Sequence, residues 1–162
     1  MGCVTQLVEL SKWSVHSEPD TTREAYAHID CGGAESCGCD ACFNFANARH
    51  LVYNAALLEL LEWLGVDPLL EAEARHDNCL EAGRHAYTAC FYLVGEISSG
   101  PATTVANQGR RCVPSLESAG KGIRVGFSAD AREAPEAFCG LPVVRLEVSV
   151  VAPWVSNAPE PL

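Results

Sequence analysis

Residues 85–97 read HAYTACFYLVGEI, and this stretch decides how the fold is interpreted. Side chains alternate between the two faces of a strand, so Tyr87 and Phe91 share one face while Cys90 and Tyr92 share the other. Both faces are mostly apolar. Because a strand with two apolar faces is covered on both sides, we expect this segment to lie in the centre of a sheet.

Four further segments are predicted to be strands around it. Residues 123–130 and 144–150 alternate apolar and polar side chains, which is typical of half-exposed strands. Residues 24–30 alternate in the same way. Residues 3–10 are short and rich in strand-favouring side chains, and we expect them at the edge of the sheet.

The strongest helical pattern covers residues 41–64, where apolar positions recur every three or four residues and form one stripe. The stripe consists of Phe43, Ala46, His50, Tyr53, Leu57, Leu60 and Leu64. Asp40 is expected to cap the start of this helix and Gly65 to end it. Residues 67–77 begin with Asp-Pro, which predicts a second, shorter helix.

Along the chain, two predicted strands precede the pair of helices and three follow it. This separation of strands from helices indicates an α+β fold. We expect a largely antiparallel sheet of about five strands, with one long and one short helix inserted after the second strand. A length of 162 residues suits a single domain over residues 1–162. Residues 98–122 show no periodicity and are expected to form a long irregular loop. The proline-rich tail 153–162 is expected to end the regular structure.

Charge and apolar content limit where the protein acts. The formal net charge is -10, and only two of the basic residues are lysines. Nucleic acid and anionic membranes attract positive surfaces, so neither is an expected partner. The sequence has no run of about eighteen apolar residues and no secretory pattern at its N-terminus. We therefore expect a soluble, cytoplasmic protein whose partner is a protein or a small molecule.

Four of the nine cysteines fall within twelve residues: Cys31, Cys37, Cys39 and Cys42. The residues between them are small or polar, so the backbone can wrap around a point. Zinc takes four soft or borderline ligands in a tetrahedron, and thiolates form readily around it. The sequence therefore predicts a zinc site made by these four cysteines, in preference to an iron–sulfur cluster, whose usual spacing differs. Four sulfurs in so short a loop are crowded, so His28 is an alternative ligand for one of them.

The same cluster permits two other interpretations. Cys39 and Cys42 form a C-x2-C pair at the start of the predicted helix, where N–H groups stabilise a thiolate, so they could act as a redox dithiol. In a variant of this hypothesis, Cys42 works as a nucleophile with a histidine. Alternatively, the cysteines are small buried residues in a glycine-rich turn. If all four thiolates bind zinc, no coordination position stays open, which argues against metal catalysis.

The other cysteines and histidines of interest are not expected to bind a metal or to react. Cys90 lies within the central strand and is expected to be a core thiol. His50 lies on the helical stripe and is expected to be a core histidine, whereas His76 and His85 flank a turn and are expected to be solvated. The sequence has no phosphate-binding loop, dinucleotide-binding motif, zinc-protease motif or serine-hydrolase motif. It therefore names no catalytic residue.

Three short segments resemble a group of small bacterial proteins without an assigned activity: residues 28–31 (HIDC), 37–44 (CGCDACFN) and 64–68 (LGVDP). The core of the likeness is a C-x-C-x2-C-x-N motif before a long helix. The resemblance covers mainly residues 26–97. It implies a bacterial source and no particular reaction.

The sequence as a whole predicts a zinc-stabilised binding or interaction domain with a cysteine-cluster loop. The alternative is a thiol-dependent redox enzyme that uses Cys39 and Cys42.

Overall fold

The protein folds around an antiparallel sheet. A computed structural model describes residues 4–10, 12–101, 104–106, 111–113, 117–118 and 122–162. The strands of the sheet are β1 (Gln6–Leu10), β2 (Trp13–Ser17), β3 (Glu73–Glu81), β4 (Arg84–Ser99), β7 (Glu117–Ser118), β8 (Arg124–Ser128) and β9 (Val143–Pro153). Within the described ranges six of these seven strands follow the order β1-β2-β4-β9-β8-β7, and the seventh, β3, pairs with β4. Two short strands, β5 (Thr104–Ala106) and β6 (Arg111–Val113), pair with each other separately.

Strand β4 is the centre of this sheet, as the sequence predicts. It is 16 residues long and pairs with β3 and β9 along its first part and with β2 near its end. Residues 87–95 are all buried, so both faces of the strand are covered. The mostly apolar composition of both faces explains this position.

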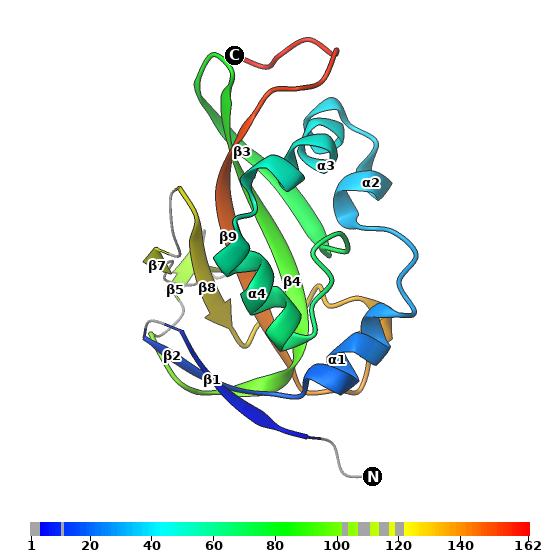
Figure 1. The fold of residues 1–162 in the computed structure, drawn as a ribbon, viewed down its shortest axis with the longest axis vertical. Coiled ribbons are helices and arrows are strands. Elements are labelled where there is room, and N and C mark those ends of the chain that lie inside the picture. The colour runs from blue at the N-terminus through cyan, green and yellow to red at the C-terminus, as the bar shows by residue number, and fades with distance from the viewer. Residues whose placement is uncertain (1–3, 11, 102–103, 107–110, 114–116, 119–121) are drawn as a thin grey trace.

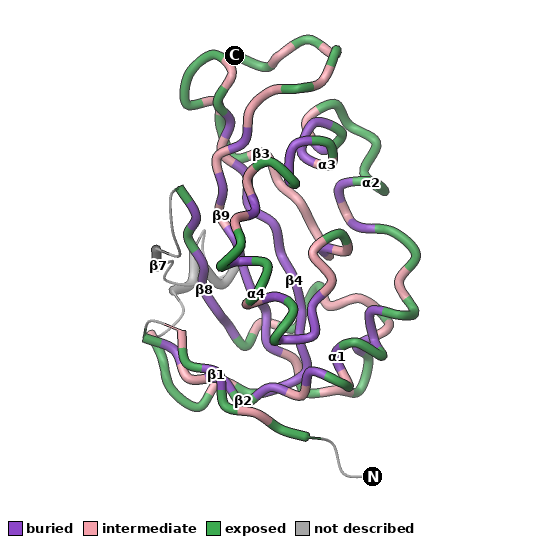
Figure 2. Tube along the Cα trace, in the orientation of Figure 1, coloured by how far each residue is buried: buried purple, intermediate pink, exposed green. Residues whose placement is uncertain are grey.

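Helices α3 (Asp40–Val52) and α4 (Ala55–Leu64) lie in front of the sheet in Figure 1 and cover one of its faces, and α1 (Pro19–Tyr26) and α2 (Gly33–Cys37) lie beside it. The short 3-10 helix η1 (Glu136–Phe138) packs through Phe138 on Tyr92, whose side chain points to the opposite face of β4. Buried positions alternate with exposed ones along α3 and α4, whereas β4 is buried for most of its length (Figure 2). Phe45 of α3 packs on Tyr87 of β4, with 5.1 Å between the ring centroids. The predicted α+β class with a largely antiparallel sheet is therefore confirmed.

The helix predicted over residues 41–64 is two helices, and its predicted stripe is wrong in the first half. Asn54 starts α4, because its side-chain Oδ1 accepts a hydrogen bond from the Leu57 N–H at 2.8 Å. This N-cap starts a separate helix, so the positions of α4 that face the core do not determine which positions of α3 face it. Phe43 and His50 are consequently exposed, so His50 is not the core histidine that the stripe predicts. The buried positions of α3 are Cys42, Asn44, Phe45, Ala48 and Arg49.

Two other segments have a different structure from the predicted one. The strand predicted over residues 24–30 is wrong, because α1 begins at Pro19 and continues to Tyr26. Proline is favourable in a first helical turn, and this signal outweighs the short alternation that follows. The helix predicted over residues 67–77 is also wrong, since β3 begins at Glu73 and pairs with β4.

The strands predicted to be half-exposed are more deeply buried. In β9, Arg145 and Glu147 occupy the polar positions of the alternation, yet only 3% and 4% of their surfaces are exposed. They form an ion pair at 3.2 Å, so each buried charge has an opposite charge beside it. In β8, the four positions after Arg124 are all buried.

β1 lies at one end of the strand order, as predicted for an edge strand. Residues 98–122 are not wholly irregular, because β5, β6 and β7 lie within them, and the rest of that predicted loop falls largely outside the described residues. Regular structure ends at Pro153. Among the described residues, no helix is long and apolar enough to cross a membrane.

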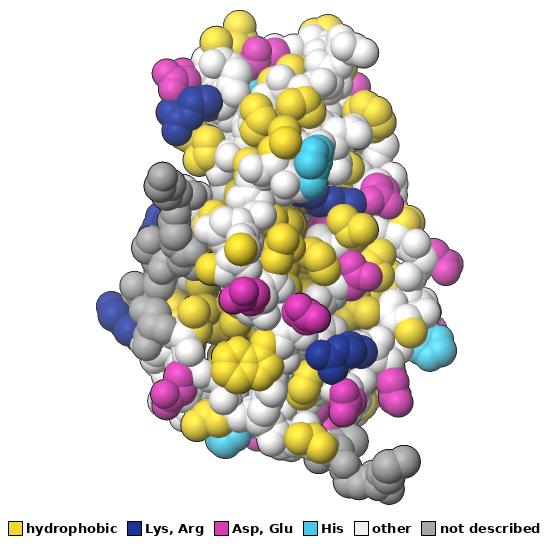
Figure 3. Space-filling view, in the orientation of Figure 1, with side chains coloured by type: hydrophobic (Ala, Val, Ile, Leu, Met, Phe, Trp, Pro, Cys, Tyr) yellow, Lys and Arg dark blue, Asp and Glu magenta, His cyan; other side chains and the backbone are white. Residues whose placement is uncertain are grey.

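Several large apolar side chains are exposed on the helices. Figure 3 shows hydrophobic side chains spread over the face that α3 and α4 cover. Those more than 40% exposed on these two helices are Phe43, Leu51, Leu58 and Trp63.

Candidate metal centre

The cysteine loop is a tight connection between two helices. Cys37 ends α2, and Cys39 is the N-cap of α3. Gly38 between them has a φ of +78°, in the left-handed region that favours glycine. This reversal turns the chain back within one residue, so the thiols of Cys37, Cys39 and Cys42 meet at one place.

The sulfur atoms of Cys37, Cys39 and Cys42 lie within 4.8 Å of one another. Cys37 and Cys39 are exposed, whereas Cys42 is buried. Three of the four cysteines predicted to bind zinc are therefore brought together at the surface.

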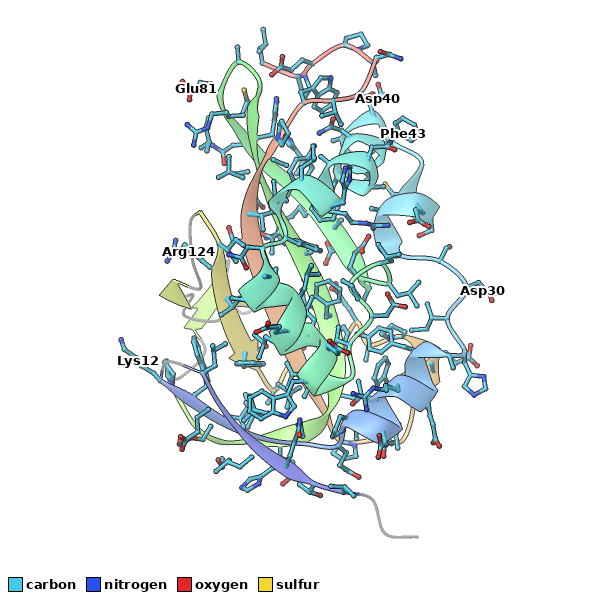
Figure 4. The ribbon with its side chains drawn as sticks, in the orientation of Figure 1. Lys12, Asp30, Asp40, Phe43, Glu81 and Arg124 are labelled. Carbon is cyan, nitrogen blue, oxygen red and sulfur yellow. The ribbon has the colours of Figure 1, made fainter. Side chains whose placement is uncertain are left out.

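Cys31 is exposed and lies outside this group. It precedes α2, whereas Cys37 ends it, and a five-residue helix separates the two by roughly 7.5 Å along its axis. Figure 4 shows Asp30, the neighbour of Cys31, on the loop before α2 and well away from Asp40 at the start of α3. His28, the alternative ligand, is also exposed and outside the group.

The start of α2 is anchored to the segment before β3. The Gly33 N–H donates to the Glu71 carbonyl at 2.7 Å. A Cβ at Gly33 would lie 2.6 Å from the Ala72 carbonyl oxygen, so only glycine allows this approach. The anchor holds the segment that carries Cys31 at the opposite end of α2 from Cys37.

A buried ion pair joins the two helices that flank the cysteine loop to the segment before β3. Arg49 of α3 donates to both carboxylate oxygens of Glu71 at 2.9 and 3.0 Å, and it also pairs with Glu35 of α2. The same Glu71 carboxylate accepts from the Ala34 N–H at 3.1 Å. Arg49 and Glu71 are both buried. Sequence reasoning missed this pair, because the two charges are 22 residues apart and neither belongs to a motif.

The two cysteines of the C-x2-C pair differ in their electrostatics. The Cys39 sulfur accepts a hydrogen bond from the Cys42 N–H at 3.4 Å, and this bond lowers the pKa of the Cys39 thiol. The Cys42 thiol donates to the Ala74 carbonyl at 3.6 Å, and burial raises its pKa. The loop therefore offers an exposed thiol that ionises readily beside a buried one that does not. A metal ion or an oxidant can use such a pair.

Asn44, the last residue of the C-x-C-x2-C-x-N motif, is completely buried. Its Oδ1 accepts from the N–H groups of Val155 and Ser156 at 2.7 and 3.0 Å. Its Nδ2 donates to the Pro153 carbonyl at 3.0 Å and to the Tyr87 hydroxyl at 3.2 Å. The asparagine therefore ties the cysteine helix to the C-terminal tail and to β4.

The prediction for Cys90 is confirmed in its burial, but its surroundings are polar. Arg145 donates to the Cys90 sulfur at 3.0 Å and to the Tyr92 hydroxyl at 2.8 Å. These residues line a cavity of about 230 Å³ together with Ala72, Glu73 and Glu133. Burial raises the pKa of the Cys90 thiol, which makes it a poor nucleophile.

The prediction that His76 and His85 are solvated is wrong for His85, which has no exposed surface. Its Nδ1 lies 2.9 Å from His76 Nε2, and its Nε2 lies 2.7 Å from Glu160 Oε1. Glu160 follows His85 by 75 residues. No motif or periodicity predicts that the tail folds back onto this hairpin.

A scan against protein-family models found no match, and searches of curated proteins and of solved structures found none.

Proposed function

We propose that this protein is a binding or interaction domain whose cysteine loop is closed by one zinc ion. The proximity of the Cys37, Cys39 and Cys42 sulfurs, within 4.8 Å of one another, carries the proposal. In a tetrahedral site with Zn–S distances of about 2.3 Å, neighbouring sulfurs are about 3.8 Å apart. A small closure of the loop is enough to reach that spacing. Thiolate donors also favour zinc over magnesium or calcium.

Three thiolates leave the fourth coordination position for another donor. Cys31 could supply it only if residues 31–33 left their anchor on Glu71 and Ala72. We therefore infer that the fourth donor is water, a small ligand or a side chain of a partner protein. Cys37 and Cys39 are exposed, so such a donor can approach from solvent.

The wider surface favours a protein or small-molecule partner. The net charge of -10 opposes binding to nucleic acid or to an anionic membrane. The exposed apolar side chains of α3 and α4 lie on the same helical layer as the cysteine loop. Free thiols persist in reducing compartments, which is consistent with the predicted cytoplasmic location.

The test is the zinc content of the purified full-length chain. We expect Cys39→Ser to lower it by about one ion per chain and to lower the melting temperature, by about 2–4 °C for each kcal/mol of stability lost. Cys139→Ser, an exposed cysteine outside the loop, is the matched control and should change neither. Cys31→Ser should also retain the zinc if the fourth donor is external. Equal zinc content in the native chain and in Cys39→Ser would contradict the proposal.

A second candidate function is a thiol redox reaction of Cys39 and Cys42. The contact between the exposed Cys39 sulfur and the Cys42 N–H favours it, because this bond stabilises the attacking thiolate. Cys39 would attack a substrate disulfide and Cys42 would then displace the substrate thiol, so two protein thiols become one disulfide and the substrate is reduced. Metal-free protein treated with oxidised glutathione should lose two hydrogens and give a linked Cys39–Cys42 peptide. Failure to form this disulfide would exclude the redox function.

A further inference from the structure

A second group of possible metal ligands lies where the C-terminal tail meets the β3–β4 hairpin. Ligand atoms of Cys79, His85 and Glu160 lie within 4.8 Å of one another. Cys79 belongs to β3, His85 to β4, and Glu160 to the tail that follows β9. None of them belongs to the cysteine loop, and the sequence motifs single out none of them.

The histidine of this group is buried and is held by contacts with the C-terminal tail. His85 is completely buried, and the ring of Trp154 packs on it with 5.2 Å between centroids. The Glu160 carboxylate accepts a hydrogen bond from the Gly83 N–H and faces His85 Nε2 at 2.7 Å. Backbone and aromatic contacts thus orient both side chains before any ion binds.

The neighbour of His85 fits the role that metal-binding histidines require. In most metal sites, the ring nitrogen that does not bind the ion donates its proton to a nearby acceptor. His76 Nε2 lies 2.9 Å from His85 Nδ1 and can accept that proton when the His76 ring carries its own proton on Nδ1. With the proton on Nδ1, the lone pair of His85 Nε2 points toward Glu160, and a cation can replace the proton that otherwise joins them.

We propose that Cys79, His85 and Glu160 form a second site for a divalent transition metal of the zinc class. One sulfur, one nitrogen and one oxygen donor favour zinc, or cobalt in its place, over magnesium and calcium. At Zn–N and Zn–O distances of about 2.0–2.2 Å, the nitrogen and oxygen would be about 3.3 Å apart in a tetrahedron. The present 2.7 Å between His85 Nε2 and Glu160 Oε1 must therefore widen by roughly 0.6 Å. This widening requires the Glu160 carboxylate, whose side chain is 26% exposed, to shift slightly while the Gly83 N–H still orients it.

Three protein ligands leave one position for water. Cys79 and Glu160 are only partly buried, so this position is open to solvent. Such a bound ion would also clamp the C-terminal tail to the β3–β4 hairpin, because its ligands come from both.

The site can be measured apart from the cysteine loop. The probe is Co²⁺, added to the full-length triple variant Cys37→Ser, Cys39→Ser, Cys42→Ser. We expect one Co²⁺ per chain and a thiolate-to-cobalt charge-transfer band. Cys79→Ser in this background should abolish the band, and Glu160→Gln should weaken binding at least about tenfold while keeping the oxygen that accepts from Gly83. Glu81→Gln and Cys139→Ser are the matched carboxylate and thiol controls.

A folded triple variant that binds no Co²⁺, or a band that persists after Cys79→Ser, would overturn the proposal. If the triple variant does not fold, zinc content of the otherwise native chain decides. It should fall by one ion per chain in Cys79→Ser and in Glu160→Gln but not in Glu81→Gln, and equal content in all three overturns the second site. A failure of the proposed zinc site in the cysteine loop is detected separately, because the zinc content of Cys39→Ser would then equal that of the native chain.

Discussion

Cys39 and Cys42 are three residues apart yet lie in opposite environments. Cys39 precedes the first turn of α3, where free N–H groups point at its sulfur. Cys42 lies within the first turn of the helix and is buried, and its thiol donates a hydrogen bond to the Ala74 carbonyl of β3. The same helix therefore lowers the pKa of one thiol while burial raises that of the other.

This difference predicts how the metal-free protein reacts with iodoacetamide. The thiolate is the reactive form, and free cysteine has a pKa of about 8.5. Because the Cys39 pKa is lowered, its alkylation rate should rise with pH and reach half its maximum below the midpoint of free cysteine. Cys42 should stay unmodified over the same range. Peptide mass spectrometry after timed quenching measures both rates, and similar rates at the two positions would refute this assignment.

At the scale of elements, the cysteine loop depends on a pair of buried charges beneath it. Arg49 and Glu71 join α3 to the segment before β3, and Glu71 also holds the Ala34 N–H of α2. Removing one partner of a buried ion pair leaves the other charge uncompensated, which costs about 3–5 kcal/mol. The pair therefore sets both stability and the position of α2 against α3.

Arg49→Met should lower the free energy of unfolding by about 3–5 kcal/mol and also weaken zinc binding at the loop. Urea unfolding measures the first effect and competition with a chelator the second. The double variant Arg49→Met, Glu71→Gln removes both charges and should regain part of the stability. Arg84→Met, which breaks the exposed pair with Glu81, is the control and should cost less than about 1 kcal/mol. A loss no larger than that of the control would speak against the role of the buried pair.

The elements that could be predicted from the sequence are those with a long, uniform pattern. The apolar faces of β4 place it in the centre of the sheet, and the start of α3 brings three of the four cysteines together. The pattern failed where one local contact outweighs it: the Asn54 side chain restarts the helix, and Pro19 starts α1. The position of Cys31 could not be predicted, because it depends on Gly33 fitting against Ala72, 39 residues further on.

At the scale of the whole molecule, the two candidate metal sites are joined through Asn44. This residue lies two positions after Cys42 and holds the backbone of residues 153–156, the part of the tail that leads to Glu160. No periodicity predicts such a link, since the partners are more than 100 residues apart. The asparagine of the C-x-C-x2-C-x-N motif thus has a structural role, because it holds the C-terminal tail against α3.

Asn44→Ala should release the tail and leave the cysteine loop folded. Val155 and Ser156 lose their acceptor, and the Tyr87 hydroxyl loses a donor, so we expect a loss of about 1–3 kcal/mol in the free energy of unfolding. Amide hydrogen exchange should accelerate in residues 155–162 and stay slow in β4. Co²⁺ affinity at Cys79, His85 and Glu160 should fall, because Glu160 is then less well positioned. Asn47→Ala is the matched control, because the Asn47 side chain donates to the Phe43 carbonyl within its own helix. Unchanged exchange in the tail of Asn44→Ala would show that the tail is held by Trp154 and Glu160 without the asparagine.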